Sequence, residues 1–198
     1  MKIRDIHYRD EFYAEFILEG DFKEANLLRK YLMGRVPVYA IDSILVRKNT
    51  TAYPIEYIAH RLGMLPIRIV SRNPSPEYRG YLNHSATKSI LELTHKDILF
   101  ESSEVSIVEY YPNGTKIRRG YEIIDLLPGQ EIDVELIIRP GIGFKHAKFQ
   151  TAIASYEQID SNTYKMFVET LYHYSARELL ERALEYMKKD IDTFKTFL

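Results

Sequence analysis

One stretch of the sequence decides the predicted fold: Val36–Ile67 reads VPVYAIDSILVRKNTTAYPIEYIAHRLGMLPI. Its first half contains β-forming residues such as Ile44 and Val46 and predicts a strand. The polar run Asn49–Thr51 then predicts a turn. Pro54 suits the start of a helix, because the N–H that proline lacks would have no helical partner there.

The helix that follows Pro54 has one apolar face, since four apolar residues lie three or four positions apart. These residues are Ile55, Ile58, Ala59 and Leu62. Gly63 and Pro66 predict the end of the helix. The quoted stretch therefore predicts a strand, a short loop and a helix.

The preceding residues predict a pair of strands over residues 2–20 and then a second helix. Asp21 is a favourable N-cap, and Glu24 three residues later completes a capping box. The helix is expected over Phe22–Met33 and to close at Gly34. Its apolar stripe contains Phe22, Ala25, Leu28 and Leu32. From the residues alone, this stripe indicates a helix buried in the chain's own core.

The middle of the chain, residues 67–156, predicts mainly β structure. Prolines at 74 and 76 with Gly80 and Asn83 predict a long loop. Strands are expected near Ile90–Leu93, Val105–Tyr110 and Ile132–Ile138, and residues 112–115, PNGT, predict a tight hairpin turn into Lys116–Ile124.

The last part of the sequence predicts one strand, Tyr164–Thr170, and a long helix capped by Ser175 with Glu178. Apolar residues then recur at alternating spacings of four and three up to the last residue. This heptad seam contains Leu180, Leu184, Met187, Ile191, Phe194 and Leu198. Such a seam packs more often in the chain's own core, but the length of the helix, together with the resemblance described below, favours a partner helix.

Composition excludes several classes of function. Lys and Arg total 27 against 28 Asp and Glu, so no overall charge draws the chain to nucleic acid. The chain has no cysteine, which excludes disulfides, thiol catalysis and cysteine-bound metal. No apolar run approaches the ~20 residues of a membrane span. We therefore expect a soluble intracellular protein, in the cytoplasm or in a eukaryotic nucleus, without membrane contact.

No catalytic, cofactor or metal site is predicted. The six histidines show no metal-binding spacing, and no hydrolase, Walker or dinucleotide motif occurs. The run GIGFKHAK offers glycines followed by three basic side chains, Lys145, His146 and Lys148. A lone G-x-G is weak evidence for phosphate binding. A basic loop that docks on an acidic partner is the better interpretation, because glycines permit close approach and cations set the register.

Four segments, in this order, resemble one known family. They are EANLLRKYLMGRVPVYAID (Glu24–Asp42), NTT with EYIAHRLGMLPI (Asn49–Ile67), LLPGQEIDVEL (Leu126–Leu136) and GIGFKHAKF (Gly141–Phe149). The chain resembles the alpha-like subunits of multisubunit RNA polymerases, namely the D-type subunit of archaea and the third-largest subunit of eukaryotes. Bacterial alpha is a more distant relative.

The resemblance implies an α+β fold with a split dimerisation domain, an antiparallel sheet plus helices, over residues 1–54 and 157–198. A mainly β insert domain would occupy residues 55–156. It also implies a non-catalytic assembly platform that pairs with a smaller alpha-like polymerase subunit of the L type and docks the second-largest subunit, besides other polymerase subunits. Direct sequence-specific contact with nucleic acid is not expected.

The resemblance also implies two sets of interface residues. The expected dimer interface contains Phe22, Ala25, Leu28, Leu32, Leu180, Leu184, Met187, Ile191, Phe194 and Leu198. The expected large-subunit docking set contains Arg29, Lys30, Arg61, Gly141, Gly143, Lys145, His146 and Lys148.

Two departures from the family pattern matter. Where many relatives carry a cysteine-bearing insertion that holds a metal or iron–sulfur cluster, residues 71–85 form a short segment without cysteine, so no cofactor is expected. We expect no counterpart of the bacterial C-terminal DNA-binding module. Three alternatives remain: a stand-alone nucleic-acid-binding module, another protein-interaction module, and an enzyme that uses the Lys145–Lys148 loop.

Overall fold

The computed structural model describes residues 1–71, 73–109 and 120–195, without the side chain of Phe194. It has three α-helices and mainly antiparallel sheets in these residues, so the prediction of an α+β protein is confirmed. The chain divides into two compact units. The first contains Met1–Val38 and Gly141–Leu198, and the second contains Tyr39–Pro140.

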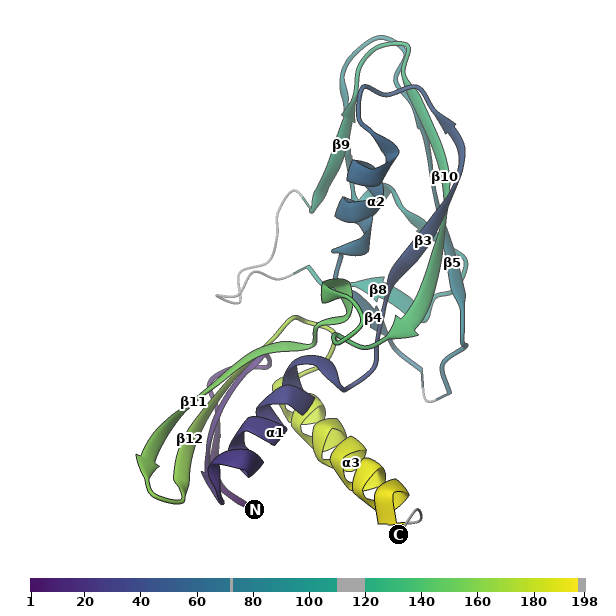
Figure 1. The fold of residues 1–198 in the computed structure, drawn as a ribbon. Helices are drawn as coiled ribbons and strands as arrows, with labels where there is room; N and C mark the ends of the chain where they lie inside the picture. The colour runs from purple at the N-terminus through teal and green to yellow at the C-terminus, as the bar shows by residue number, and fades with distance from the viewer. Residues whose placement is uncertain (72, 110–119, 196–198) are drawn as a thin grey trace. The chain divides into compact units, whose positions relative to one another are not determined.

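The first unit is a four-stranded antiparallel sheet with two helices on one face (Figure 1). Its strands are β1 (Lys2–Tyr8), β2 (Tyr13–Glu19), β11 (Ala152–Asp160) and β12 (Thr163–Thr170), in the order β1-β2-β12-β11. Every second residue of β2 and β12 is buried against the helices α1 (Phe22–Gly34) and α3 (Ala176–Lys195). This alternation gives the sheet one face in the core and one face towards solvent.

The start of α1 follows the sequence prediction closely. The Asp21 carboxylate accepts the Glu24 N–H at 2.8 Å, and the Glu24 carboxylate accepts the Asp21 N–H at 2.9 Å. These two bonds satisfy two of the N–H groups that a helix start leaves without partners. The predicted capping box is therefore confirmed.

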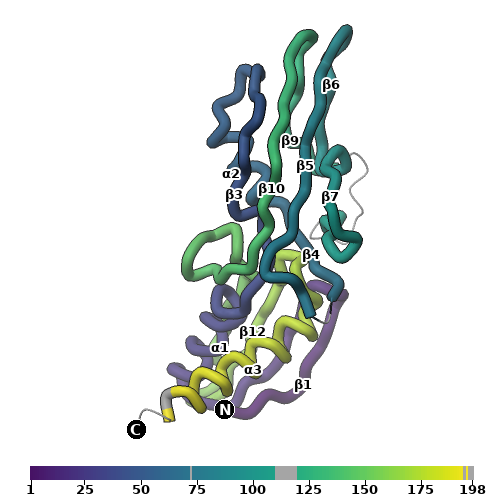
Figure 2. Tube along the Cα trace, turned by 90° about the vertical axis from the view of Figure 1, so that its right-hand side faces the viewer, coloured from purple at the N-terminus to yellow at the C-terminus, as the bar shows by residue number. Residues whose placement is uncertain are grey.

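The second unit is mainly β and also contains the helix α2 (Ile55–Gly63) (Figure 2). Its main sheet has the order β3-β10-β5-β7, formed by Val38–Asn49, Glu131–Gly141, Tyr78–Ser85 and Leu99–Phe100. Two further pairs are β4 (Ile67–Ile69) with β8 (Val105–Ile107), and β6 (Leu91–Thr94) with β9 (Glu122–Leu126). A 3₁₀ turn, η1, spans His95–Asp97. The core of the unit lies between these strands and α2.

The quoted stretch folds as predicted, with one local difference. β3 is the strand, and the Asn49 side chain closes the turn by accepting the Thr51 N–H at 3.0 Å. Ile58 and Leu62 of α2 are fully buried. Pro54 occupies the N-cap, with an extended backbone, rather than the first helical position.

Two secondary-structure predictions are wrong. The loop predicted around Gly80 and Asn83 is instead the strand β5, where Gly80 is needed because an added Cβ would lie 2.9 Å from the Phe100 ring. The prediction of a single strand before α3 missed β11. The predicted PNGT turn lies outside the described residues. Within the part of the chain that the structure describes, no helix has the length and apolarity to cross a membrane.

Candidate protein-interaction site

The end of α1 meets the segment Gly141–Thr151 at two glycines. A Cβ added at Gly143 would lie 2.9 Å from the Gly34 Cα and 3.0 Å from the Met33 carbonyl oxygen. Both neighbours are backbone atoms, which do not move aside as a flexible side chain does. Gly143 therefore permits a backbone-to-backbone contact that a larger residue would prevent.

The same segment satisfies the carbonyl groups at the C-terminal end of α1. The Phe144 N–H donates to Gly34 O at 3.2 Å, and the Thr151 N–H donates to Met33 O at 3.1 Å. The Thr151 hydroxyl, which is buried, donates to Leu32 O at 2.5 Å. These groups would otherwise lack partners, because the last carbonyls of a helix have no N–H further along the chain.

The basic part of the segment is held in shape by local contacts. The imidazole Nδ1 of His146 accepts the Lys148 N–H at 3.1 Å and begins the 3₁₀ turn η2 (Ala147–Phe149). Phe149 is buried, and its ring fills the space beside Gly141, where an added Cβ would lie 2.6 Å from it. Gly141 and Phe149 thus anchor a loop whose Lys145 and His146 side chains are exposed.

A cavity of about 260 Å³ opens between this loop and α1. Its lining residues are Arg29, Lys30, Met33, Gly34, Gly143, Phe144 and Gln150. The Arg35 guanidinium lies over the Phe144 ring, 4.8 Å from its centroid, and Phe144 is 56% exposed. The cavity lining therefore combines the cationic side chains of Arg29 and Lys30 with the apolar side chains of Met33 and Phe144.

The two segments that form this cavity carry charge of one sign. Residues 29–35 and 141–150 together contain five Lys and Arg side chains and neither Asp nor Glu. They are Arg29, Lys30, Arg35, Lys145 and Lys148. The whole chain is nearly neutral, so this is a local concentration of positive charge. Such a surface attracts an acidic partner and sets its orientation. We call the cavity, together with the neighbouring Arg35, Lys145 and Lys148, the basic cavity.

The structure brings most of the predicted docking residues together. Arg29, Lys30 and Gly143 line the basic cavity, and Gly141, Lys145, His146 and Lys148 belong to its loop. Arg61 lies in the other unit, on α2. Its guanidinium donates to the carbonyl of Glu122 and lies 5.7 Å from the centroid of the Tyr57 ring.

The predicted dimer residues divide into buried and exposed groups. Five are buried in the first unit's own core, namely Ala25, Leu28, Leu32, Leu180 and Met187. Leu184 is half-buried, whereas Phe22 and Ile191 are 59% and 49% exposed. Phe194 and Leu198 have no described side chain. Of these residues, the exposed ones can contact another chain directly. The buried ones pack in the core below them.

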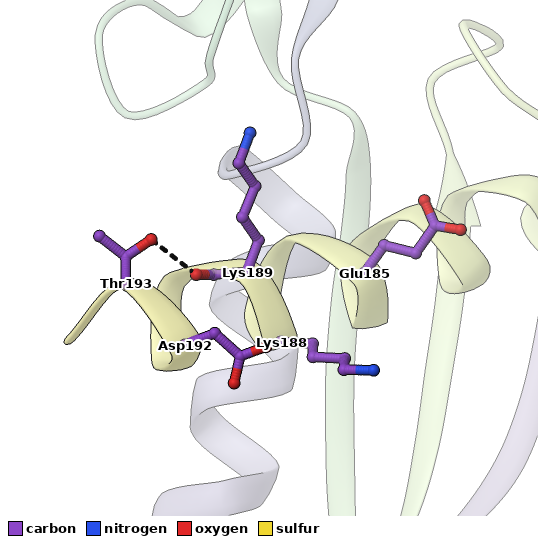
Figure 3. Close-up of a pocket in the computed structure, with 5 residues that line it drawn as sticks. All are labelled: Glu185, Lys188, Lys189, Asp192 and Thr193. Carbon is purple, nitrogen blue, oxygen red and sulfur yellow. Dashed lines mark hydrogen bonds between the residues drawn. The ribbon is translucent and has the colours of Figure 1, made fainter. Parts of the chain in front are cut away.

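The last two described turns of α3 extend past the buried stripe. A surface depression of about 510 Å³ is lined by Glu185, Lys188, Lys189, Asp192 and Thr193. Figure 3 shows these five side chains on α3. Among the described side chains of α3, the last buried one is Met187. The Tyr31 hydroxyl of α1 donates to the Asp190 carboxylate at 2.5 Å and ties this part of α3 to α1. Burial, together with that bond, raises the pKa of Tyr31 to about 12.

Sequence reasoning missed five residues of the basic cavity: Met33, Gly34, Arg35, Phe144 and Gln150. Phe144 could have been predicted from the sequence, since it is an apolar residue inside a basic, glycine-containing loop. The others could not, because their role depends on the meeting of two distant segments. Among the described residues, no group of three or more His, Cys, Asp or Glu side chains is placed to hold a metal ion.

Comparison with known proteins identifies the class of this chain. No protein-family model matches it. The DNA-directed RNA polymerase subunit Rpo3 of Methanocaldococcus jannaschii is 30% identical over 179 residues, covering 90% of this chain and 86% of that protein. The DNA-directed RNA polymerases II, IV and V subunit 3 of Arabidopsis thaliana is 31% identical over 176 residues, covering 77% and 54%. RPAC1 of human DNA-directed RNA polymerases I and III is 32% identical over 190 residues, covering 80% and 55%.

These relatives are all subunits of DNA-directed RNA polymerases, so the chain belongs to the transcription machinery. It is a member of the alpha-like subunit family, which includes the archaeal D-type and the eukaryotic third-largest subunits. The family prediction from sequence is thus confirmed. The chain spans about half the length of the two eukaryotic relatives.

Proposed function

We propose that this chain is a non-catalytic assembly platform of an RNA polymerase. It pairs with a smaller alpha-like subunit through α1 and α3, and it docks the second-largest subunit through the basic cavity. The observation that carries the proposal is the convergence of the end of α1 and the Gly141–Thr151 segment, whose residues 29–35 and 141–150 include basic but no acidic side chains. Family membership supports the assignment to a polymerase.

Pairing is supported by the end of α3. A helix of 20 residues is about 30 Å long, and among the side chains that the structure describes in α3, the buried ones lie between Ala176 and Met187. Beyond Met187, Ile191 presents an apolar side chain on a helix otherwise rich in charge. On α1, Leu27 is 41% exposed. A partner helix that covers these apolar side chains removes them from water.

The discriminating variant for pairing is Ile191→Asp. A carboxylate forced into an apolar interface loses its hydration, so we expect affinity for the smaller subunit to fall at least about tenfold while circular dichroism stays unchanged. Ile6→Asp on β1 changes a similarly exposed isoleucine and serves as the control. Met187→Asp and Leu184→Asp should also abolish pairing, but Met187 is buried and its replacement would unfold the unit. Wild-type affinity of Ile191→Asp would exclude this end of α3 from the interface.

Docking is tested by reversing the charge of the basic cavity. We expect the double variant Lys145→Glu with Lys148→Glu, and separately Arg29→Glu, to weaken binding of the second-largest subunit while pairing remains intact. The steepness with which binding falls as salt rises should also decrease, because fewer charge contacts remain. Lys23→Glu, an exposed lysine on the first turn of α1, is the control. Loss of pairing in the loop variant would show that the loop belongs to the dimer interface instead.

A further inference from the structure

The sheet of the first unit ends in two edge strands that differ in protection. On β1, the register with β2 shifts between Arg4 and His7, Asp5 has a φ of 55°, and charges are frequent. Native sheets use such bulges and charges to prevent pairing at an edge. On β11, residues 152–156 (AIASY) carry no charge and no proline, and their register with β12 is unbroken. β11 thus offers an edge that is open to pairing.

The direction of the backbone groups shows which of them face this edge. The Leu171 N–H donates to the Thr151 carbonyl at 2.9 Å, so the residue before β11 points its carbonyl towards the β12 side. In an antiparallel ladder, the N–H and C=O of one residue point the same way, and successive residues alternate. The residues that face the open edge are therefore Ala152, Ala154, Tyr156 and Gln158.

One face of α1 runs along β11 and forms a wall beside the edge. Phe22, Asn26, Arg29 and Met33 lie four and three positions apart and share that face. At one end the Phe22 ring contacts Tyr156 of β11 edge-on, at 6.2 Å between centroids. At the other end the Met33 carbonyl accepts the Thr151 N–H. Figure 1 shows α1 beside β11 along this length.

The two ends of this groove differ in charge. Arg29 and Lys30 of the basic cavity lie near its Ala152 end, where the Gln150 side chain donates to Ala152 O at 3.0 Å. At the other end, Glu157 is exposed and makes no ion pair within the described residues. Its register neighbour Lys165 pairs with Glu15 instead, at 2.8 Å.

Exposed apolar side chains lie on both sides of the edge. On the solvent face of β11, Ile153 and Ile159 are 57% and 58% exposed. On the α1 side, Phe22 is 59% exposed. A strand added here would gain backbone hydrogen bonds and would also cover apolar surface on both of its faces.

We propose that the β11 edge and this face of α1 bind an extended segment of a partner protein as an added strand. The segment has apolar side chains at alternate positions, an acidic residue at the Ala152 end and a basic residue opposite Glu157. Charge complementarity selects this occupant over an unspecific apolar peptide. The groove shares Arg29 and Met33 with the proposed docking surface and Phe22 with the predicted dimer interface. The proposal nevertheless rests on the edge geometry, and its test needs no polymerase partner.

The test uses the whole chain and a synthetic probe. The probes are the peptide acetyl-Glu-Val-Val-Thr-Val-Lys-Val-amide and the peptide of reversed sequence, one for each strand direction. We expect one of them to bind by fluorescence anisotropy and to slow amide hydrogen exchange at Ala154 and Tyr156. Methylation of alternate peptide nitrogens should weaken binding by about tenfold or more, because it removes the ladder bonds. If neither peptide slows exchange at these amides, the proposal is wrong.

Variants of the chain give an independent readout. Ala154→Pro removes one N–H that faces the open edge and leaves the groups that face β12, so it should abolish peptide binding, whereas Ala154→Ser should retain it. Glu157→Lys should weaken binding of the probe and strengthen binding of a probe that has glutamate in place of lysine. Equal binding of N-methylated and unmodified probes would contradict strand addition. Self-association of the wild-type chain that Ala154→Pro abolishes would assign the edge to a second copy instead.

Discussion

Gly143 determines how closely the Gly141–Thr151 segment approaches α1. Because an added Cβ would meet backbone atoms at 2.9 and 3.0 Å, Gly143→Ala should push the segment away and weaken the bonds to the Gly34 and Met33 carbonyls. We expect a loss of roughly 1–3 kcal/mol in the free energy of unfolding, measured with urea. Lys145→Ala, at an exposed position of the same loop, should change it by less than about 0.5 kcal/mol. If Gly143→Ala left the free energy of unfolding unchanged, the close contact between Gly143 and the end of α1 would not be required for stability.

Tyr31 joins the two helices of the first unit through one hydrogen bond. Tyr31→Phe keeps the buried ring and removes the bond to Asp190, so we expect a loss of about 1.5–3 kcal/mol in the free energy of unfolding. Asp190→Asn provides the second arm of a double-mutant cycle, and fully additive effects would contradict a direct interaction.

The same tyrosine gives the first unit a pH dependence. Its pKa is raised from the ordinary 10.0 to about 12, so the folded state holds the hydroxyl proton more tightly than the unfolded state. The resulting stability is fully present below about pH 10 and is lost as pH rises towards 12. The difference in urea midpoint between wild type and Tyr31→Phe should shrink over this interval. A difference that stays constant would contradict the assignment.

At the scale of single elements, α1 depends on its N-terminal cap. Asp21→Ala removes the acceptor of the Glu24 N–H and should cost about 1 kcal/mol of stability. Asp21→Asn retains a good acceptor and should be nearly neutral. Urea unfolding followed at a helical circular dichroism band distinguishes the two. Equal losses in both variants would show that the charge of Asp21, and not its hydrogen bond, stabilises the helix.

Elements with strong local signals could be predicted from the sequence. The capping box at Asp21 and Glu24 needs residues only three positions apart, and both α1 and the turn at Asn49 follow such rules. β5 was missed because Gly80 resembles a loop residue, although tertiary contact with Phe100 requires it. β11 was missed because AIASYEQID has little alternation of apolar and polar residues.

The heptad seam shows a second limit of sequence reasoning. Apolar spacing identified only part of the packed face of α3, since the fully buried Leu179 and Ala183 lie outside the seam. It also does not distinguish the chain's own core from a partner. Leu180 and Met187 pack in the core, whereas Ile191 of the same seam is exposed. The basic cavity had no complete sequence signal, since Thr151 and Leu32 are 119 residues apart and meet only in the folded chain.

For the whole molecule, the two units have separate hydrophobic cores. Leu28 is buried in the core of the first unit and Leu82 in that of the second. Replacement of either by Ala should cost about 2–5 kcal/mol. We expect Leu28→Ala to speed amide hydrogen exchange mainly in the first unit, and Leu82→Ala mainly in the second. If each variant accelerated exchange equally in both units, the chain would unfold as one cooperative body.

The division of the first unit between the two ends of the sequence has a consequence for synthesis on the ribosome. When β2 and α1 emerge, the strand that pairs with β2 on its inner side, β12, has not yet been translated. The last carbonyls of α1 likewise lack their hydrogen-bond donors until Phe144 and Thr151 have been translated. Residues 39–140, in contrast, form a continuous unit with its own core. We expect this second unit to reach its native structure first, while the nascent apolar surface of α1 remains open to chaperones until α3 has been made.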